Sequence, residues 1–520
     1  MGEGILRFFK TKINKEYKIA FTSTFLIAIL IHLYKFVNTL PNQDSLHNYY
    51  ADQNILGSGR WALSWACGIS SYYDLPWVIG LLSCVFIALT VVVLVALFRL
   101  KNPVLIALSG ALLAAAPATT ETFFFLYTAD GYMIAMFLAA LAVYLSRLEE
   151  KRYSRFILSG VCICVCCGIY QASVSFALLL AICYFIDALL QNEHSKQDCL
   201  KWVLRQAIIF AAALAAYYVI WKLFLRFTGT AANTYQGISD VGKFRPELLI
   251  SGLISAVKAT TLYFIQWNVF ERGFSLYSAL HVLFLFVMVA GLLIACVRSG
   301  ILKRKWAVVL LVLCLVAIIP FACIWSFTSD AVGYRAMMLQ SLTTLFILTA
   351  LLYEKWAKTT LKDAVCLFLI LIVFNNALIA NISYFYLNLC YERTYAEGLE
   401  MILEIHDLQD EYQFDKIAVV GTRLDQLLFE NYDHETGIMA PAGKLHILSS
   451  RFRDSLLYDA EHTTRYLEAT FGLKLEPLHY TLRNELHETE QVKAMACWPA
   501  AGSMAVLGDT LVIKLSDTIE

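Results

Sequence analysis

The sequence predicts an α-helical polytopic membrane protein followed by a small soluble domain. Of its 520 residues, 59% are hydrophobic and 16% are charged, and the mean hydropathy is +0.62, whereas soluble domains are about one quarter charged. Residues 1–390 contain 30 Lys or Arg and 18 Asp or Glu, and residues 391–520 contain 11 and 23. This division predicts a basic transmembrane domain over 1–390 and an acidic soluble domain over 391–520. Because the net charge is zero, nucleic acid is not an expected partner.

About eleven apolar segments are long enough to cross a lipid bilayer, which takes about 20 residues. They cover roughly 19–37, 76–98, 103–119, 130–146, 155–171, 173–190, 206–226, 277–297, 306–326, 336–353 and 363–388. Lysines and arginines precede the first span and recur in every second link, as they do in cytoplasmic loops. The N-terminus is therefore predicted in the cytoplasm and the C-terminal domain outside it.

The apolar segment 248–267 is treated differently because it contains Lys258. Counting it as a span would place the basic link 298–305 outside the cytoplasm, against the distribution of the other basic links. We therefore expect this segment to lie on the outer face, or to dip into it, within a long loop over 227–276.

The fourteen cysteines lie mostly inside apolar segments, and CICVCC at 162–167 is the densest group. Its spacing is not that of a zinc site, which pairs two CxxC-type clusters. Cysteine within a membrane acts as a small apolar residue that lets helices pack closely. The sequence therefore predicts helix packing here, and no disulfide framework.

The soluble domain is expected to be a compact α/β or α+β fold, because strand and helix patterns alternate along it. Helices are predicted over 396–412 and 454–471, the latter with Asp454 as N-cap. Strands are predicted over 414–421 and 444–448, and a closing hairpin over 506–515 turns at Gly508-Asp509. No phosphate-binding glycine loop is present in the sequence of this domain.

Polar residues gather in the links predicted to lie outside the cytoplasm. The first link, 41–76, contains Asp44, His47, Asp52 and Arg60, and the second, 120–131, contains Glu121 and Asp130. The remaining outer links contribute Tyr170-Gln171, then Tyr235, Gln236, Asp240, Lys243, Arg245, Glu271 and Arg272, and finally Asp330, Tyr334 and Arg335. Ionisable groups near the membrane are costly unless they face a cavity or a partner. The pattern therefore predicts one site at the outer membrane surface.

Such a site suits transfer of a sugar from a lipid-linked donor. A carboxylate can take the proton of an attacking hydroxyl, and cations can neutralise a departing phosphate. Each residue also has a structural alternative: Asp44 as a solvated loop acid, Asp52 on the surface of an interfacial helix over 46–56, and Arg60 extending toward the headgroups.

Four short motifs resemble those of the GtrII-like bacterial glucosyltransferases, membrane enzymes of the wider GT-C type. They are GSGRWAL at 57–63, TADGY at 128–132, GIYQAS at 168–173 and WPAAGSMAVLGDTLVIKLS at 498–516. The resemblance covers nearly the whole chain. It implies a polyprenyl-phosphate-linked sugar donor, typically glucose, and a cell-envelope glycan such as O-antigen as acceptor.

The resemblance also implies roles for individual residues in an inverting transfer. The base in the first outer link matches Asp44 best and Asp52 second. The two acids are not adjacent, unlike the paired acids of some GT-C relatives, which leaves open which of them is the base. The other implied roles are acceptor orientation or help to the base for Glu121 and Asp130, donor-phosphate binding for Arg60 and Arg335, and donor or acceptor contacts for Tyr170, Gln171 and Asp330. Some GT-C enzymes use a divalent metal ion, but no ligand cluster in the sequence assigns one.

Two other functions stay open at this stage. A transporter or flippase for a lipid-linked glycan would have polar residues in the middle of its spans and two related halves, and neither pattern is evident. A non-catalytic envelope-assembly protein would use the C-terminal domain as a binding module.

Overall fold

The computed structural model describes residues 14–42, 44–45, 49–240, 243, 245–265, 276–423 and 455–518. The chain divides into two compact units. The first comprises Met1–Val37, Ala51–Asn381 and Thr436–Ser449, and the second comprises Asn38–Tyr50, Ile382–Glu435 and Ser450–Glu520. The first outer link is thus divided, because its residues up to Tyr50 belong to the second unit and those from Ala51 belong to the first.

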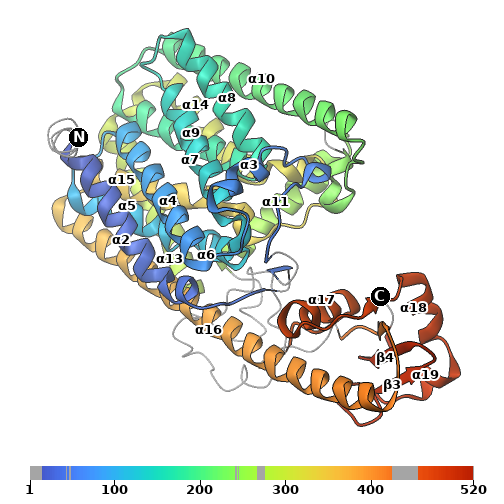
Figure 1. Ribbon diagram of the computed structural model, residues 1–520. Coiled ribbons are helices and arrows are strands. Elements are labelled where there is room, and N and C mark those ends of the chain that lie inside the picture. The colour runs from blue at the N-terminus through green and yellow to red at the C-terminus, as the bar shows by residue number, and fades with distance from the viewer. Residues whose placement is uncertain are drawn as a thin grey trace, which may run out of the picture. The chain divides into compact units, whose positions relative to one another are not determined.

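The first unit is built of long apolar helices (Figure 1). Their bounds are α2 Lys15–Val37, α4 Pro76–Phe98, α5 Pro103–Ala114, α6 Pro117–Phe124, α7 Ala129–Leu145, α8 Tyr153–Ile169, α9 Ser173–Gln191, α10 Lys196–Thr228, α11 Leu248–Ile265, α13 Leu276–Ser299, α14 Lys305–Ala322, α15 Thr343–Trp356 and α16 Thr359–Glu411, which belongs to the second unit from Ile382 onward. Among the described residues, 10 helices are long and apolar enough to cross a membrane, or up to 11 with α5 and α6 as one span bent by 43°. The predicted polytopic helical fold is confirmed.

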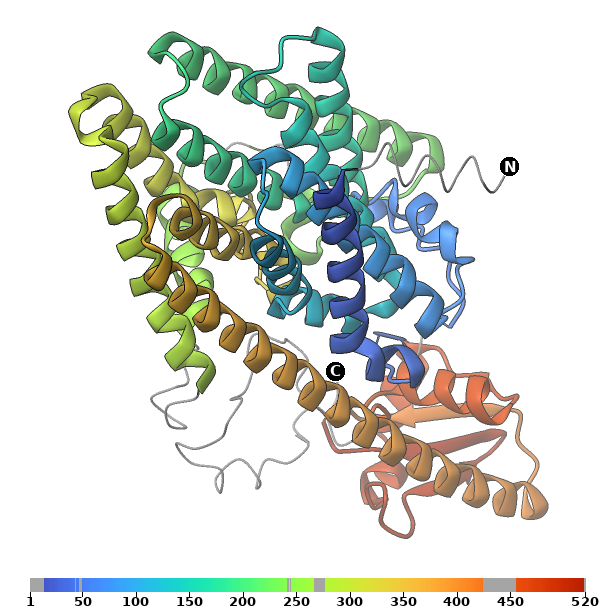
Figure 2. The same cartoon turned by 90° about the vertical axis from the view of Figure 1, so that its left-hand side faces the viewer.

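Helix α9 lies at the centre of this bundle. All of its residues from Ser173 to Leu190 are buried except the half-buried Leu178, as expected of a helix that is apolar on every side. It packs against α7, α14 and α15, while α2, α4, α7, α8 and α10 pack one against the next in that order (Figure 2). The cysteines at 162–167 are buried thiols within α8, where they allow this close packing.

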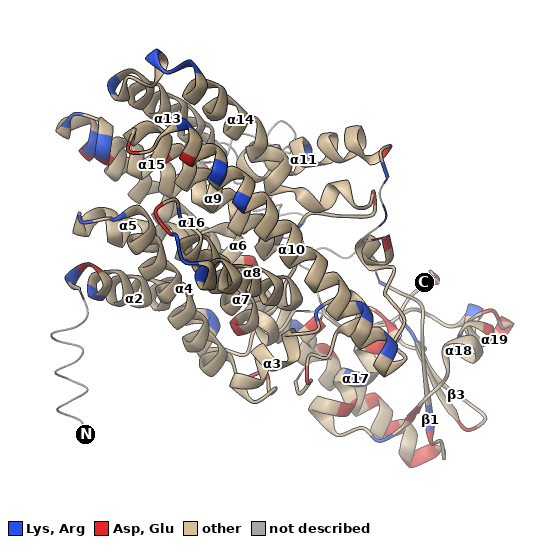
Figure 3. Cartoon of the chain, turned by 90° about the horizontal axis from the view of Figure 1, so that it is seen from above, with Lys and Arg blue, Asp and Glu red and all other residues tan. Residues whose placement is uncertain are grey.

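The basic links meet at one end of the bundle, here called the basic end (Figure 3). Arg99, after α4, is 2.7 Å from Glu149 of the α7–α8 link and 3.7 Å from Glu193 of the α9–α10 link. Arg304, before α14, donates to Asn192 at 2.5 Å, and Asn102 of the α4–α5 link donates to Glu354 near the end of α15 at 3.2 Å. Links predicted to share one side of the membrane therefore share one end of the fold.

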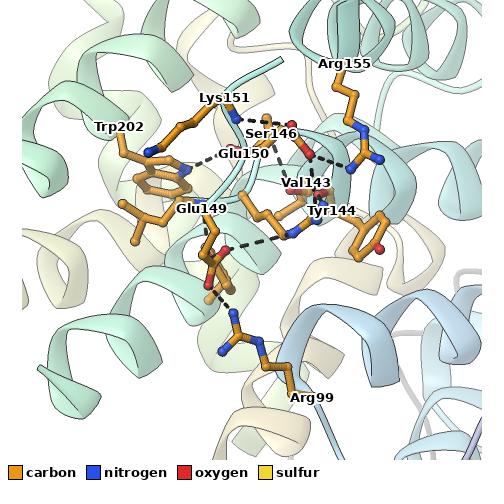
Figure 4. A network of polar contacts seen from close by, with 12 residues as sticks. Arg99, Val143, Tyr144, Ser146, Glu149, Glu150, Lys151, Arg155 and Trp202 are labelled. Carbon is orange, nitrogen blue, oxygen red and sulfur yellow. Dashed lines mark hydrogen bonds and ion pairs between the residues drawn. The ribbon is translucent and has the colours of Figure 1, made fainter. Parts of the chain in front are cut away.

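The α7–α8 link is held at the basic end by side chains of its own and of α10 (Figure 4). The carboxylate of Glu150 accepts hydrogen bonds from the backbone N–H groups of Lys151 and Arg152 at 3.1 and 3.0 Å and pairs with Arg155. The backbone N–H of Arg152 and the Arg155 side chain are the main causes that lower the pKa of Glu150. Trp202 of α10 donates to the carbonyl of Ser146 at 2.8 Å, which satisfies an oxygen that the end of α7 leaves open.

Both ends of α11 contact the end of the bundle opposite the basic links. Near its start, Ser251 donates to Asp330, which follows α14, at 2.9 Å. Near its end, the carbonyl of Tyr263 accepts from Tyr277 in the first turn of α13 at 2.7 Å. Although α11 is long and apolar enough to cross a membrane, these contacts support the expectation that it lies within an outer loop.

The pair Asp187–Lys355 joins α9 to α15 at the basic end. The ammonium of Lys355 donates to both carboxylate oxygens of Asp187 at 2.9 and 2.8 Å, and Gln191 donates to the same carboxylate. The Asp187 side chain is 4% exposed, so this residue is not a solvated helix end. A buried carboxylate persists here because an opposite charge and an amide satisfy it.

Replacing Asp187 with Asn is expected to lower the free energy of unfolding by about 3 kcal/mol, because it leaves the ammonium of Lys355 without its counter-charge. Thermal unfolding of the full chain in detergent micelles measures this effect. The double variant Asp187→Asn/Lys355→Met should recover most of the loss. Glu193→Gln, at a carboxylate that is 53% exposed, is the control and should cost less than about 0.5 kcal/mol. Equal losses in the single and double variants would contradict the pairing.

The second unit contains a four-stranded sheet in the order β2-β1-β4-β3. Its strands and helices beyond α16 are β1 Lys416–Val420, α17 Ala460–Phe471, β2 Glu476–Pro477, α18 Tyr480–His487, α19 Glu490–Ala494, β3 Met504–Leu507 and β4 Thr510–Lys514. β1 is parallel to both β2 and β4, and β3 pairs antiparallel with β4 as the predicted hairpin. The helix predicted from Asp454 begins instead at Ala460, with Asp459 as its N-cap. Asp454 and the strand predicted at 444–448 lie outside the described residues.

Helices cover both faces of this sheet, because successive residues of a strand point to opposite sides. Ile417 and Val419 of β1 pack with residues of α16 and α17. Ala418 and Val420 pack with Val492 of α19 and with half-buried residues around α18. The helix that follows β1 in the described chain therefore lies on one face, and the helix that follows β2 lies on the other.

Candidate active site

The residues after Tyr50 in the first link do not form the helix that the sequence predicts over 46–56. Residues 50–55 have no helical structure, and Ala51 donates its N–H to the carbonyl of Tyr72 at 3.1 Å. Asp52 is exposed, and its carboxylate accepts the backbone N–H of Asn54 at 3.0 Å. This hydrogen bond closes a local turn and occupies one oxygen of the carboxylate. Aspartate side chains commonly form such turns in loops.

A sharp turn at Gly59 then carries the chain into the bundle. Gly59 has a φ of +77°, and a Cβ atom there would lie 2.3 Å from the hydroxyl of Tyr217, so the turn requires glycine. Gln171 donates its amide to the carbonyl of Ser58 at 2.6 Å, and Trp325 donates to the carbonyl of Gln171 at 3.1 Å. Gln171 thus fixes the position of the residue before the turn, Ser58, rather than pointing to open space.

Arg60, the next residue, lies beside two stacked tyrosines. Its Nη1 donates to the hydroxyl of Tyr132 in α7 at 2.8 Å. The rings of Tyr132 and Tyr170 are parallel with centroids 3.9 Å apart, and the guanidinium carbon is 5.8 and 5.3 Å from their centroids. The buried Nε of Arg60 has no hydrogen-bond partner among the described residues. The guanidinium is therefore held in place and still has a donor to offer a ligand.

Two more charged residues approach this pair of tyrosines. Burial and Tyr132 raise the pKa of Tyr170 well above its ordinary value, Glu121 acts in the same direction, and Arg60 and Arg335 oppose it. Arg335 lies 5.5 Å from the ring centroid of Phe125, and its Nη2 is 3.4 Å from the hydroxyl of Tyr235. Burial acts to lower the pKa of Arg60, and the surrounding tyrosines, Tyr235 among them, raise it. Residues from all five outer links therefore meet around Tyr170.

Glu121 is fully buried in α6 and is tied to the fifth link. Its Oε2 accepts the backbone N–H of Met337 at 2.6 Å. α6 packs directly against the 3₁₀ helix Ala336–Leu342 that contains this residue. A carboxylate buried at this position is stabilised by the backbone donor.

A small, mainly apolar pocket borders the cluster. Its walls include the two tyrosines together with Met133, Met337 and Phe176. Arg60 lies against the two tyrosines of this lining. A cation next to an apolar pocket suits a lipid phosphate, because its head is anionic and its tail is apolar.

The remaining predicted site residues lie elsewhere or cannot be related to this cluster. Asp130 is fully buried in the first turn of α7, where its carboxylate accepts the N–H of Gly131 at 2.8 Å and lies close to Cys67 and Ser70. Asp330 accepts from Ser251 and is exposed. Asp44 is half-buried and belongs to the second unit. His47, Glu271 and Arg272 lie outside the described residues.

The sequence did not single out Tyr132 as a partner of Arg60, nor Phe125 as the ring beside Arg335. Tyr132 belongs to the TADGY motif that the sequence analysis identified, but the predicted site residue in that motif was Asp130. Side chains two residues apart on a helix point in nearly opposite directions. That geometry places Tyr132 against Arg60 while Asp130 faces Cys67.

Replacing Glu121 with Gln is expected to reduce glucosyl transfer about tenfold while the protein stays folded. Glutamine keeps an oxygen for the N–H of Met337 but removes a buried charge beside Tyr170, and such a charge change alters transition-state electrostatics. Steady-state transfer rates measure the effect, and thermal unfolding confirms the fold. Glu247→Gln, at another acid of the outer links, serves as the matched control. Full activity in Glu121→Gln would remove this carboxylate from the site.

Within the described part of the chain, no group of three or more His, Cys, Asp or Glu is placed to hold a metal ion.

Comparison with known proteins assigns the family. The family model described as Glucosyl transferase GtrII matches residues 33–353. Comparisons with curated proteins and with solved structures give no match. The matched region includes Arg60, Glu121, Tyr132, Tyr170 and Arg335. The chain belongs to the glucosyl transferase GtrII family and is a membrane glucosyltransferase.

Proposed function

We propose that this glucosyltransferase moves glucose from a polyprenyl-phosphate carrier to a cell-envelope glycan such as O-antigen on the outer face of the membrane. The N-terminus would be cytoplasmic and the C-terminal domain, residues 391–520, outside. The observation that carries the proposal is the meeting of Arg60 and Arg335 around the stacked Tyr132 and Tyr170, at helix ends opposite the basic links. Two cations beside an apolar pocket suit a lipid-linked phosphate.

The proposed reaction is a single displacement of the GT-C type with inversion at the anomeric carbon. A hydroxyl oxygen of the acceptor forms a bond to C1 of glucose while the bond from C1 to the phosphate oxygen breaks. Asp44 takes the hydroxyl proton, with Asp52 as the alternative base. Polyprenyl phosphate leaves with the bonding electron pair, and Arg60 and Arg335 offset its negative charge.

The other site residues act by orientation in this proposal. Glu121 and Asp130 position the acceptor or support the base. Tyr170 contributes its ring to the donor site, while Gln171 fixes the turn that holds Arg60, because it anchors Ser58. Asp330 contributes an exposed carboxylate from the fifth link to the acceptor side. Rigid placement of such groups lowers the entropic cost of bringing donor and acceptor together.

The direct test uses the purified full chain in proteoliposomes with synthetic polyprenyl-phosphate glucose and an envelope glycan. Mass spectrometry is expected to show the glycan gaining one hexose per transfer while polyprenyl phosphate appears in equal amount. The configuration of the new linkage, read by NMR, should be opposite to that of the donor. Transfer from a nucleotide sugar alone, with the lipid-linked sugar untouched, would overturn the proposed donor.

A further inference from the structure

The second unit has a pocket at the carboxyl end of its parallel strands. The pocket is lined by the last residues of β1, by the start of α17 and by one side of α18. Its polar and backbone-exposing members are Gly421, Thr422, Ala460, Arg483, Asn484 and His487. All of these residues belong to the second unit.

The topology explains why a pocket forms at this place. β1 and β2 are neighbours and parallel, while α17 packs on one face of the sheet and α18 on the other. Helices on opposite faces leave a crevice outside the carboxyl ends of the strands, and open α/β sheets bind ligands there. Gly421, with a φ of +82°, provides the sharp turn that ends β1.

The side chains of the pocket favour an anion. None of the described lining residues is acidic. His487 is 6% exposed, and among the described residues its Nδ1 makes no hydrogen bond. The guanidinium of Arg483 makes no ion pair within the described part of the chain, and Asn484 adds an amide beside it. The Nε2 of His487 lies 3.4 Å from the carbonyl of Ser516, so Nδ1 becomes a donor when the imidazole is protonated, and a ligand that brings acceptor oxygens would satisfy it.

The acids nearest to His487 already have partners. Glu488 is 3.8 Å from its Nδ1 but lies 2.9 Å from the ammonium of Lys493. Asp517 lies 2.7 Å from the ammonium of Lys514. Both carboxylates are mostly exposed. The acids around the pocket are therefore neutralised without Arg483. The planar guanidinium of Arg483 carries several N–H donors whose spacing matches the oxygens of carboxylate and phosphate groups.

We propose that this pocket binds a small anionic group, a phosphate or a carboxylate, through Arg483, Asn484 and His487. The proposal does not depend on the mechanism of glucosyl transfer. An anionic group borne by a glycan or by a free metabolite would present the same oxygens to it.

Isothermal titration of the full chain in detergent micelles tests the proposal with inorganic phosphate, glucuronate and neutral glucose as probes. At least one anion is expected to bind saturably, and glucose is not. Preference for glucuronate over phosphate would indicate a carboxylate-bearing glycan as the natural ligand. Preference for phosphate over glucuronate would indicate a ligand that bears a phosphate group. Arg483→Gln should weaken anion binding about tenfold or more, because charge-assisted pairs are the strong ones.

Arg465→Gln is the matched control, because Arg465 lies in the same unit on α17, pairs with Glu461 and is 52% exposed. This variant should bind as the wild type does. Asn484→Ala is a second probe of the pocket and should weaken binding several-fold, which protects the test against misfolding of a single variant. Absence of saturable anion binding to the wild type, equal affinity in Arg483→Gln, or equal binding of glucose would each overturn the proposal.

Discussion

Replacing Asp44 with Asn is expected to reduce glucosyl transfer about a thousandfold. The proposed base takes a proton in the transition state, and loss of such a group costs roughly 10²–10⁴ in rate. Because asparagine has the size of aspartate but cannot accept the proton, the loss should appear in kcat, with KM for the lipid donor nearly unchanged. Steady-state assays in proteoliposomes separate the two constants.

Asp52→Asn is the matched comparison within the same link. Asp52 is exposed and its carboxylate caps a turn at Asn54, so its replacement should change the rate less than about threefold. The pair of variants decides which acid is the base. A large loss in Asp52→Asn with full activity in Asp44→Asn would exchange the two roles. Full activity in both would remove the first link from the chemistry.

Replacing Arg60 with Gln is expected to reduce transfer about a hundredfold or more. The guanidinium is held by Tyr132 and lies against Tyr170, so it is already oriented when the donor binds. A preorganised hydrogen-bond donor aimed at the charge that develops in the transition state contributes a factor of about 10²–10³ to the rate. Rates measured with saturating lipid donor test this expectation, because polyprenyl phosphate leaves more slowly when its charge is not offset.

Two further variants separate charge from position. Arg226→Gln changes an exposed arginine in the last turn of α10 and should leave the rate within about twofold. Tyr132→Phe keeps the stacked ring but removes the hydroxyl that receives Arg60, and a several-fold loss is expected. If Arg60→Gln retained wild-type kinetics, the phosphate would have to be bound elsewhere.

The helical fold could be predicted because membrane spans are encoded locally, in runs of apolar residues flanked by basic ones. The ranges predicted for α4 and α9 agree closely with the structure. The bend between α5 and α6 could not be predicted, because it begins at Pro117, within a run of otherwise ordinary span residues. Local composition alone does not show where a proline kinks a helix and where neighbours straighten it.

The candidate site was predictable as a set of loops but not as a set of contacts. The sequence placed Arg60, Glu121, Tyr170 and Arg335 on one side of the membrane. The stacking of Tyr170 on Tyr132, and the backbone donor from Met337 to Glu121, depend on packing between elements far apart in the chain. Such pairings are non-local, and periodicity carries no information about them.

The C-terminal domain shows the same limit. The hairpin of β3 and β4 was predictable because a Gly-Asp turn joins two strands that are adjacent in sequence. The two-residue strand β2 carries no strand pattern, since one of its two residues is Pro477. Its pairing with β1 determines where α17 and α18 lie, so the pocket between them could not be predicted.

The contacts between α10 and the end of α7 set an order of events during synthesis. Ribosomes make α7 before α10, yet Trp202, Arg205 and Gln206 supply the donors for the carbonyl of Ser146. Until α10 emerges, the carbonyl of Ser146 lacks these three donors. Nascent chains released before Trp202 should therefore be more readily cut by an added protease near residues 146–152 than chains released after Gln206. The amino-terminal half of the bundle can thus complete its folding only after about two fifths of the protein has been made.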